Sequence, residues 1–217
     1  MRDEAFEVFI EDIGEASFRT PALELSFEKY QKVLPKQFLE YWKEEGWCGY
    51  ADGLFWTVNP EDYEGLVECW LSGTPFEKLD KYHVVARSAF GKLYAWGERN
   101  HRTLVILCPT SALIGIEKEL RTPAKDPDIA AQVFFASKKK QELDMKDEAG
   151  KALFQRALKK LGPLAPDEMY GFEPALVAGG GNRLENLRKV NLFVHLAIVR
   201  ELAEPRIPFA GVDPGAQ

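Results

Sequence analysis

The sequence predicts an α+β fold, in which an antiparallel sheet carries helices packed on it and the chain forms two closely associated subdomains. The first observation is helical spacing, since apolar residues recur at three- and four-residue steps over residues 26–46. The second is a series of short β-rich runs separated by tight-turn residues, over residues 47–58 and 82–108. With 217 residues, 46% of them hydrophobic, the chain is long and apolar enough to bury a sizeable core.

The helical segment divides at Pro35, which ends one helix and opens a second over residues 36–45. Gly46 follows at the position where a helix C-cap is expected. The apolar stripe of this segment is expected to pack on the core and consists of Tyr30, Val33, Leu34, Phe38, Leu39 and Trp42.

A hairpin is predicted next, with strands over residues 47–50 and 54–58 joined by the tight turn Ala51-Asp52-Gly53. Asn59-Pro60 closes the hairpin, and residues 61–71 have the spacing of a short helix. The residues expected to point inward from that helix are Tyr63, Leu66, Val67 and Trp70.

The middle of the chain is predicted to form a three-stranded meander, with strands over residues 82–86, 93–96 and 103–108. A polar stretch with two prolines, residues 121–128, predicts a linker or an exposed crossing loop. The apolar run 129–137 that follows is interpreted as another strand.

The C-terminal part begins with three lysines, residues 138–140, which would discourage edge-to-edge pairing of that strand. A helix is predicted over residues 151–161, ended by Gly162-Pro163, and a longer helix over residues 184–202, stopped by Pro205. The buried stripe of the longer helix is expected to be Leu187, Val190, Val194, Ile198 and Leu202.

The charge of the chain is unevenly distributed. The formal net charge is −6, yet residues 1–80 hold 18 acidic and 7 basic side chains, a net charge of −11, and residues 81–217 carry +5. An acidic N-terminal part argues against nucleic-acid binding, because it repels phosphates. It fits a surface that meets a basic partner. A solvated acidic face that keeps the protein soluble is the equally weighted alternative.

Several classes of protein are excluded by composition. No stretch approaches the roughly 20 apolar residues of a membrane span, and the acidic start of the chain is unlike a signal peptide. The three cysteines are Cys48, Cys69 and Cys108, which are few, odd in number and widely spaced, as in a reduced compartment. We therefore expect a cytoplasmic protein without membrane association.

No catalytic constellation is found in the sequence. Gly179-Gly180-Gly181 lacks the spacing of a phosphate-binding loop and favours a permissive turn. Asp167 and Glu168 are adjacent, which favours local turn capping over an acid/base pair. Cys108 and His195 lie in apolar runs, which favours burial over nucleophilic or metal-ligand use. We expect no enzyme activity, no cofactor and no metal.

An acidic cluster on the predicted helix 61–71 is the remaining functional signal. Glu61, Glu64 and Glu68 would share one helix face, with Asp62 beside them. Like charges at these spacings mildly destabilise a helix, and a basic protein partner would compensate their repulsion. Accidental surface acidity is the alternative interpretation.

Two stretches carry a resemblance to known families. The first is LPKQFLEYWKEEGWCGYADGLFWTVNPEDYEGLVECWL, followed by ARSAFGKLYAWGE, and it resembles the GAD-like domain. The second covers residues 154–202, with Gly162-Pro163-Leu164, Asp167-Glu168-Met169-Tyr170-Gly171-Phe172 and Pro174-Ala175-Leu176, and it resembles the C-terminal domain of immunity proteins that pair with type VI secretion DNase effectors. The resemblance suggests domains over residues 1–120 and 129–204. The proline and glycine content of residues 205–217 predicts a loose tail.

This resemblance implies a cytoplasmic antitoxin that binds a cognate bacterial toxin, in the first place a DNase. Binding would prevent self-intoxication, and the resemblance implies no catalysis. The partner-binding residues are expected to be Asp52, Glu61, Asp62, Glu64 and Glu68, with Asp167 and Glu168 as a second group. Two alternatives stay open, an adaptor or regulatory module that binds a protein unrelated to toxins, and an enzyme with a pocket that the sequence does not reveal. The oligomeric state is left open.

Overall fold

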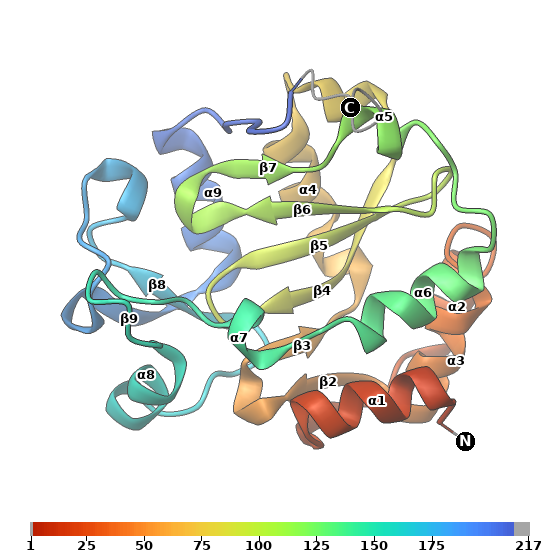
Figure 1. Ribbon diagram of the computed structural model, residues 1–217, viewed down its shortest axis with the longest axis horizontal. Helices are drawn as coiled ribbons and strands as arrows, with labels where there is room; N and C mark the ends of the chain where they lie inside the picture. The colour runs from red at the N-terminus through yellow and green to blue at the C-terminus, as the bar shows by residue number, and fades with distance from the viewer. Residues whose placement is uncertain (1, 211–217) are drawn as a thin grey trace.

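The computed structural model describes residues 2–210 and has the predicted α+β class, with a seven-stranded antiparallel sheet as its centre (Figure 1). The strands pair in the order in which they occur along the chain, so the large sheet is a continuous meander. Its strands are β1 (Ala16–Thr20), β2 (Trp47–Tyr50), β3 (Phe55–Thr57), β4 (Tyr82–Ser88), β5 (Lys92–Gly97), β6 (Thr103–Leu107) and β7 (Ala112–Ile114). A separate two-stranded sheet pairs β8 (Glu168–Phe172) with β9 (Leu187–Asn191).

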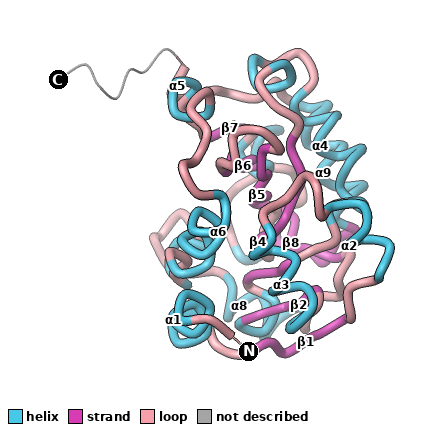
Figure 2. The backbone as a smooth tube through the Cα atoms, turned by 90° about the vertical axis from the view of Figure 1, so that its right-hand side faces the viewer, coloured by secondary structure: helices cyan, strands magenta, loops and turns pink. Residues whose placement is uncertain are grey.

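Helices cover both faces of the large sheet. Figure 2 shows α1 and α6 on one side of the strands and α4 and α9 on the other. The α-helices of the described residues are α1 (Glu4–Ile13), α2 (Glu24–Tyr30), α3 (Lys36–Glu45), α4 (Glu64–Leu71), α5 (Glu117–Leu120), α6 (Pro127–Ala136), α7 (Lys140–Leu143), α8 (Phe154–Leu161) and α9 (Leu192–Leu202).

The core under α1 and α6 is built from aromatic rings. The rings of Phe9 and Phe55 are 5.5 Å apart, and Phe135 of α6 lies 5.2 Å from Phe9 and 5.3 Å from Phe6. Tilted and edge-to-face pairs of this kind each contribute about 0.5–1.5 kcal/mol beyond the area they bury. The N-terminal helix is therefore held both to β3 of the large sheet and to α6, from which more than a hundred residues of sequence separate it.

Most of the predicted elements are confirmed. The second helix spans Lys36–Glu45 between Pro35 and Gly46, whose φ is 78°, and β2 has its predicted bounds. The three-stranded meander is β4, β5 and β6. The helix predicted over 151–161 begins later, at Phe154, and ends at Leu161. The N-terminal pair α1 and β1 had no counterpart in the sequence-based expectation.

The strand predicted over residues 129–137 is wrong, because this run forms α6. Asp126 caps the helix, since its Oδ1 accepts hydrogen bonds from the backbone N–H groups of Asp128 and Ile129, and Pro127 occupies the first turn. A short apolar run cannot be assigned from periodicity alone, but this cap and proline are helix-start signals. The lysines at 138–140 consequently follow a helix and do not protect a strand edge.

The helix predicted over residues 184–202 is correct only from Leu192 onward. Of the preceding residues, 184–186 form a 3₁₀ turn and 187–191 form β9, which pairs with β8. Asn191 caps α9 by accepting a hydrogen bond from the Val194 N–H group at 3.1 Å. The part of the predicted buried stripe that lies on α9 is wrong. The Val194 side chain is 60% exposed, and Ile198 and Leu202 are each about half exposed. The buried residues of α9 are Leu192, Leu196 and Val199.

The two edges of the large sheet differ. At β7, Arg206 donates its backbone N–H to the Ser111 carbonyl and accepts from the Leu113 N–H group, both at 2.8 Å, so the start of the predicted loose tail is tied to the sheet. The remainder of that tail, residues 211–217, lies outside the described residues. β1 forms the opposite edge, and four of its five residues are exposed.

No helix among residues 2–210 combines the length and the hydropathy that crossing a membrane requires.

Candidate partner-binding surface

The acidic segment predicted as one helix is a short 3₁₀ turn, η2 (Pro60–Tyr63), followed by α4. Asn59 starts it, because its side-chain oxygen accepts a hydrogen bond from the Glu61 N–H group at 3.3 Å. The inward-facing residues are as predicted, since all of them are buried: Tyr63, Leu66, Val67 and Trp70. The acidic side chains are thereby left on the outside of a segment that is anchored in the core.

Lys29 of α2 neutralises part of this acidity. Its Nζ lies 2.9 Å from Oε1 of Glu61 and 3.0 Å from Oε1 of Glu64. Tyr30 adds a hydrogen bond from its hydroxyl to Glu64 at 3.2 Å. Burial raises the pKa of Glu64, but Lys29 and Tyr30 outweigh it, and the pKa lies below its usual value. Glu61 and Glu64 thus share one lysine from another helix.

Asp62 and Glu68 differ from these two, since neither forms a side-chain hydrogen bond or ion pair with another residue in the range 2–210. Both are exposed. Partial burial, together with the charge of Glu61, raises the pKa of Asp62. A cationic partner could therefore bind Asp62 and Glu68 without breaking an ion pair or side-chain hydrogen bond within residues 2–210.

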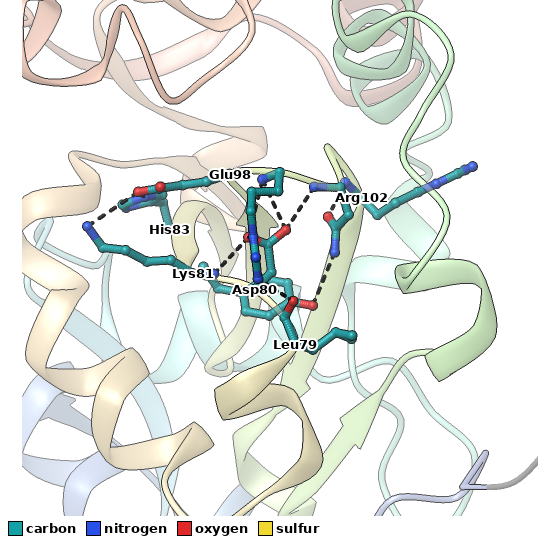
Figure 3. Close-up of polar contacts among 9 residues, drawn as sticks. Leu79, Asp80, Lys81, His83, Glu98 and Arg102 are labelled. Carbon is teal, nitrogen blue, oxygen red and sulfur yellow. Dashed lines mark hydrogen bonds and ion pairs between the residues drawn. The ribbon is translucent and has the colours of Figure 1, made fainter.

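Glu68 and Glu64 stand at a cleft of about 720 Å³ between α4 and the turn joining β5 to β6. Asp80 belongs to the lining of this cleft, and Figure 3 shows the polar contacts around it. The Asp80 carboxylate, which is 5% exposed as a residue, accepts from the backbone N–H groups of Lys81, Arg99 and Asn100 and from Nε of Arg99. Its hydrogen-bonding capacity is used to hold the turn, so Asp80 is a structural acid.

A second pair in the same cleft joins His83 and Glu98. The distance from Nε2 of His83 to Oε1 of Glu98 is 2.7 Å, and Nζ of Lys81 lies 3.3 Å from the same oxygen (Figure 3). Burial lowers the pKa of His83, and the neighbouring Glu98 opposes this only in part. The uncharged imidazole is therefore favoured, and Glu98 is occupied by its two neighbours.

The secondary candidates Asp167 and Glu168 have different roles. Oε2 of Glu168 accepts from the Ala165 N–H group at 2.9 Å and lies 3.0 Å from Nζ of Lys189, and both contacts lower its pKa, the first more strongly. Glu168 is consequently engaged in a local turn. Asp167 is exposed and its side chain receives one long hydrogen bond, from Nδ2 of Asn191 at 3.3 Å.

The structure brings Asp167 together with Asp62. Both line a groove of about 330 Å³ whose walls are largely apolar and include Phe18, Leu23 and Trp56. More than a hundred residues of sequence separate the two carboxylates, so their spacing in the chain gave no sign of this. The helical spacing of the N-terminal residues Phe6, Phe9, Ile10 and Ile13 is a signal that could have located α1, the helix before β1.

Asp52 is not brought to this surface. It lies in the turn η1 (Ala51–Gly53) with φ 58°, at the end of β3 opposite to Asn59 and η2. There it lines a separate hollow together with Lys140 and Lys146. Asp52 therefore lines a different hollow from those lined by Asp62, Glu64 and Glu68.

The remaining chemistry of the surface is limited to charge and apolar contact. Among residues 2–210, no group of three or more histidine, cysteine or acidic side chains is arranged to hold a metal ion. Cys48 and Cys108 are buried free thiols, and burial raises the pKa of both. The arrangement suits recognition of a cationic protein surface.

Two family models match the chain. Residues 4–110 match the GAD-like domain, and residues 129–203 match the C-terminal domain of the type VI secretion system immunity protein Tdi1. The resemblance noted from the sequence is confirmed in both parts. No curated protein matches the chain.

The fold also has a match among solved structures. The crystal structure of Atu4351 from Agrobacterium tumefaciens superimposes with a TM-score of 0.82 at 25% sequence identity, over 93% of this chain and 91% of that one. The similarity therefore extends across both matched regions and the segment between them.

Proposed function

Because the chain joins a GAD-like domain to a C-terminal domain of the Tdi1 immunity-protein type, we propose that it is an immunity protein that binds and neutralises a cognate type VI secretion effector. The observation that carries the proposal is the match of residues 129–203, which supports an immunity role. Neutralisation in this account is stoichiometric binding in the cytoplasm of the producing cell, without turnover of a substrate.

We further propose that the effector is a DNase with a basic surface. Proteins that act on DNA concentrate lysine and arginine where they meet phosphates, and such surfaces attract acidic inhibitors. The N-terminal 80 residues of this chain carry a net charge of −11, and part of it lies on the segment of Glu61, Asp62, Glu64 and Glu68. Charge complementarity would speed the encounter and orient the effector.

The test is growth protection. The effector encoded beside the gene for this chain is expressed in a susceptible host together with the wild-type chain, with the variant Glu61→Lys/Asp62→Lys/Glu64→Lys, or with a control. The control reverses three exposed acids elsewhere, Glu11→Lys/Glu185→Lys/Glu201→Lys, so that the change in net charge is matched. Cleavage of plasmid DNA by the purified effector is measured in parallel.

We expect the wild-type chain and the control to restore growth and to block DNA cleavage, and the variant at residues 61–64 to fail. A wild-type chain that leaves the effector toxic would refute the immunity function. Full protection by the variant would show that the effector contacts a surface other than residues 61–64, and it would not contradict the immunity function. An effector that arrests growth without cutting DNA would refute the DNase assignment alone.

A further inference from the structure

We propose that the groove shared by Asp62 and Asp167 receives a lysine or arginine side chain of the effector, carried on a segment with apolar neighbours. This rests on the proposed function and specifies which chemistry of the effector is recognised and where. We define the recognition groove as the hollow lined by Phe18, Leu23, Trp47, Trp56, Asp62 and Asp167, with Phe193 of α9 at its side.

The apolar wall of the recognition groove is open to a partner. Leu23 is 61% exposed and Phe18 is 37% exposed. The ring centres of Phe18 and Trp56 lie 5.5 Å apart in a tilted arrangement, and those of Phe193 and Tyr63 lie 5.0 Å apart, so the aromatic rings hold one another in place. A partner side chain would therefore meet a preformed apolar wall, which lowers the entropic cost of binding.

The charges of the recognition groove are all negative. Asp62 and Asp167 are the titratable carboxylates in its lining, and neither forms an ion pair with a residue that the structure describes. Among the described residues, no lysine or arginine belongs to the lining, and the buried Arg87 interacts with Asp167 from beneath it. A cation that enters the groove gains two carboxylates and displaces no existing cation.

Arg87 lies beneath the recognition groove and does not compete for this position. It is fully buried, its Nη2 donates to the Pro166 carbonyl at 2.8 Å, and its guanidinium lies 4.8 Å from the centre of the Trp56 ring. These contacts attach the groove floor to the turn that carries Asp167. Arg87 positions the acidic side of the groove and offers no surface to a ligand.

A long basic side chain fits this combination better than a small cation or a plain apolar residue. Its methylene stem can cover Phe18 and Leu23 while its charged head reaches the carboxylates, and the half-buried indole of Trp47 favours a cation placed over it. The groove also draws on both matched regions, with Trp56 and Asp62 in residues 4–110 and Asp167 in residues 129–203. One inserted side chain would thus contact both parts of the chain.

Calorimetry with the purified effector encoded beside this gene tests the proposal, using full-length chains. The first variant, Asp62→Asn/Asp167→Asn, keeps the shape of both side chains and removes two charges. Its matched control, Glu11→Gln/Glu201→Gln, removes two exposed charges outside the groove. We expect the first variant to bind about 100-fold more weakly, as when one side of a buried charge pair is removed, and the control to bind within about threefold of wild type.

A third variant, Leu23→Ser, separates binding from folding. Leu23 is the N-cap residue of α2 with an extended backbone and no capping hydrogen bond, and serine is a favoured N-cap, so the variant should be as stable as wild type or more so. Loss of the apolar wall should still weaken binding by about tenfold.

Wild-type affinity in both groove variants would overturn the groove proposal and leave the immunity function intact. Equal weakening by the control double variant would also overturn it, because general charge would then explain the effect. Absence of wild-type binding would overturn the immunity function, and the groove proposal with it.

Discussion

Nη2 of Arg87 donates a hydrogen bond of 2.8 Å to the carbonyl of Pro166, across 79 residues of sequence, from a position with no exposed surface. Arg87 belongs to β4 of the large sheet, and Pro166 to the turn before β8. The Tyr170 N–H group adds a bond to the Ala89 carbonyl at 2.9 Å. The matched regions are thereby joined directly beneath Asp167, so the geometry of the acidic surface depends on this junction.

Arg87→Lys is expected to lower the free energy of unfolding by about 1–3 kcal/mol, because lysine cannot reach the Ser88 and Pro166 carbonyls together as the guanidinium does. Urea denaturation measures the change. Arg183→Lys, at an exposed ion pair with Glu148, is the control and should change stability by less than about 1 kcal/mol. Equal values for the two variants would show that the Arg87 contacts add nothing to stability.

Lys29→Gln is expected to raise the association rate with the effector about two- to fivefold at low salt, because it frees Glu61 and Glu64. The gain should shrink as ionic strength rises, since exposed charges are screened. Stopped-flow association at two salt concentrations checks this. Lys32→Gln removes one nearby exposed charge and serves as the reference, and a rate increase no larger than in that variant would contradict the prediction.

Gly180→Ala and Gly65→Ala are expected to change stability in opposite directions. A Cβ at Gly180 would overlap the Pro174 carbonyl oxygen, which should cost about 1–3 kcal/mol. A Cβ at Gly65 in α4 meets open space, and alanine should stabilise the helix there by about 0.5–1 kcal/mol. Thermal unfolding of both proteins measures the difference. If Gly180→Ala unfolds at the wild-type temperature, the backbone at Gly180 does not pack against the Pro174 carbonyl, which would contradict this prediction.

The stability of the protein is expected to decrease as pH falls below about 6.5, partly through His83. Burial lowers the pKa of His83 in the folded state, with Glu98, Lys81 and Glu64 as the charged neighbours. The unfolded chain therefore binds the proton first, so stability is complete above the unfolded pKa and is lost as pH falls toward the folded pKa. Unfolding in urea at pH 7.5 and 5.5 checks the slope.

In His83→Gln the slope between these pH values should become shallower, whatever the variant does to stability at pH 7.5. His195, whose pKa burial also lowers, keeps its own share of the slope. An unchanged slope in the variant would show that His83 does not titrate differently in the two states.

The sequence predicted the elements whose signals are local. Pro35 and Gly46 bracket α3, and the Ala51-Asp52-Gly53 turn separates β2 from β3. It failed at α6 because the helix-start residues Asp126 and Pro127 belong to the polar stretch that predicts a linker. It failed at β9, where the same apolar residues fit a strand and a helix equally and tertiary pairing decides. Met169 and Val190, for example, face each other only because β8 and β9 pair.

The candidate surface was predictable in part for the same reason. The inward and outward faces of residues 61–71 followed from helical spacing. The ion pairs of Lys29 with Glu61 and the meeting of Asp62 with Asp167 in one groove depend on packing between distant segments. The position of the acidic segment could therefore be predicted from the sequence. Which of its carboxylates form ion pairs could not be predicted.

The central claim is that this chain acts by forming a direct complex with its effector. Size-exclusion chromatography with light scattering on a mixture of the full-length chain and the purified effector encoded beside its gene tests it most directly. The account predicts a single heteromeric species that persists through the column at micromolar concentrations. Two separate peaks with the masses of the free proteins would contradict it.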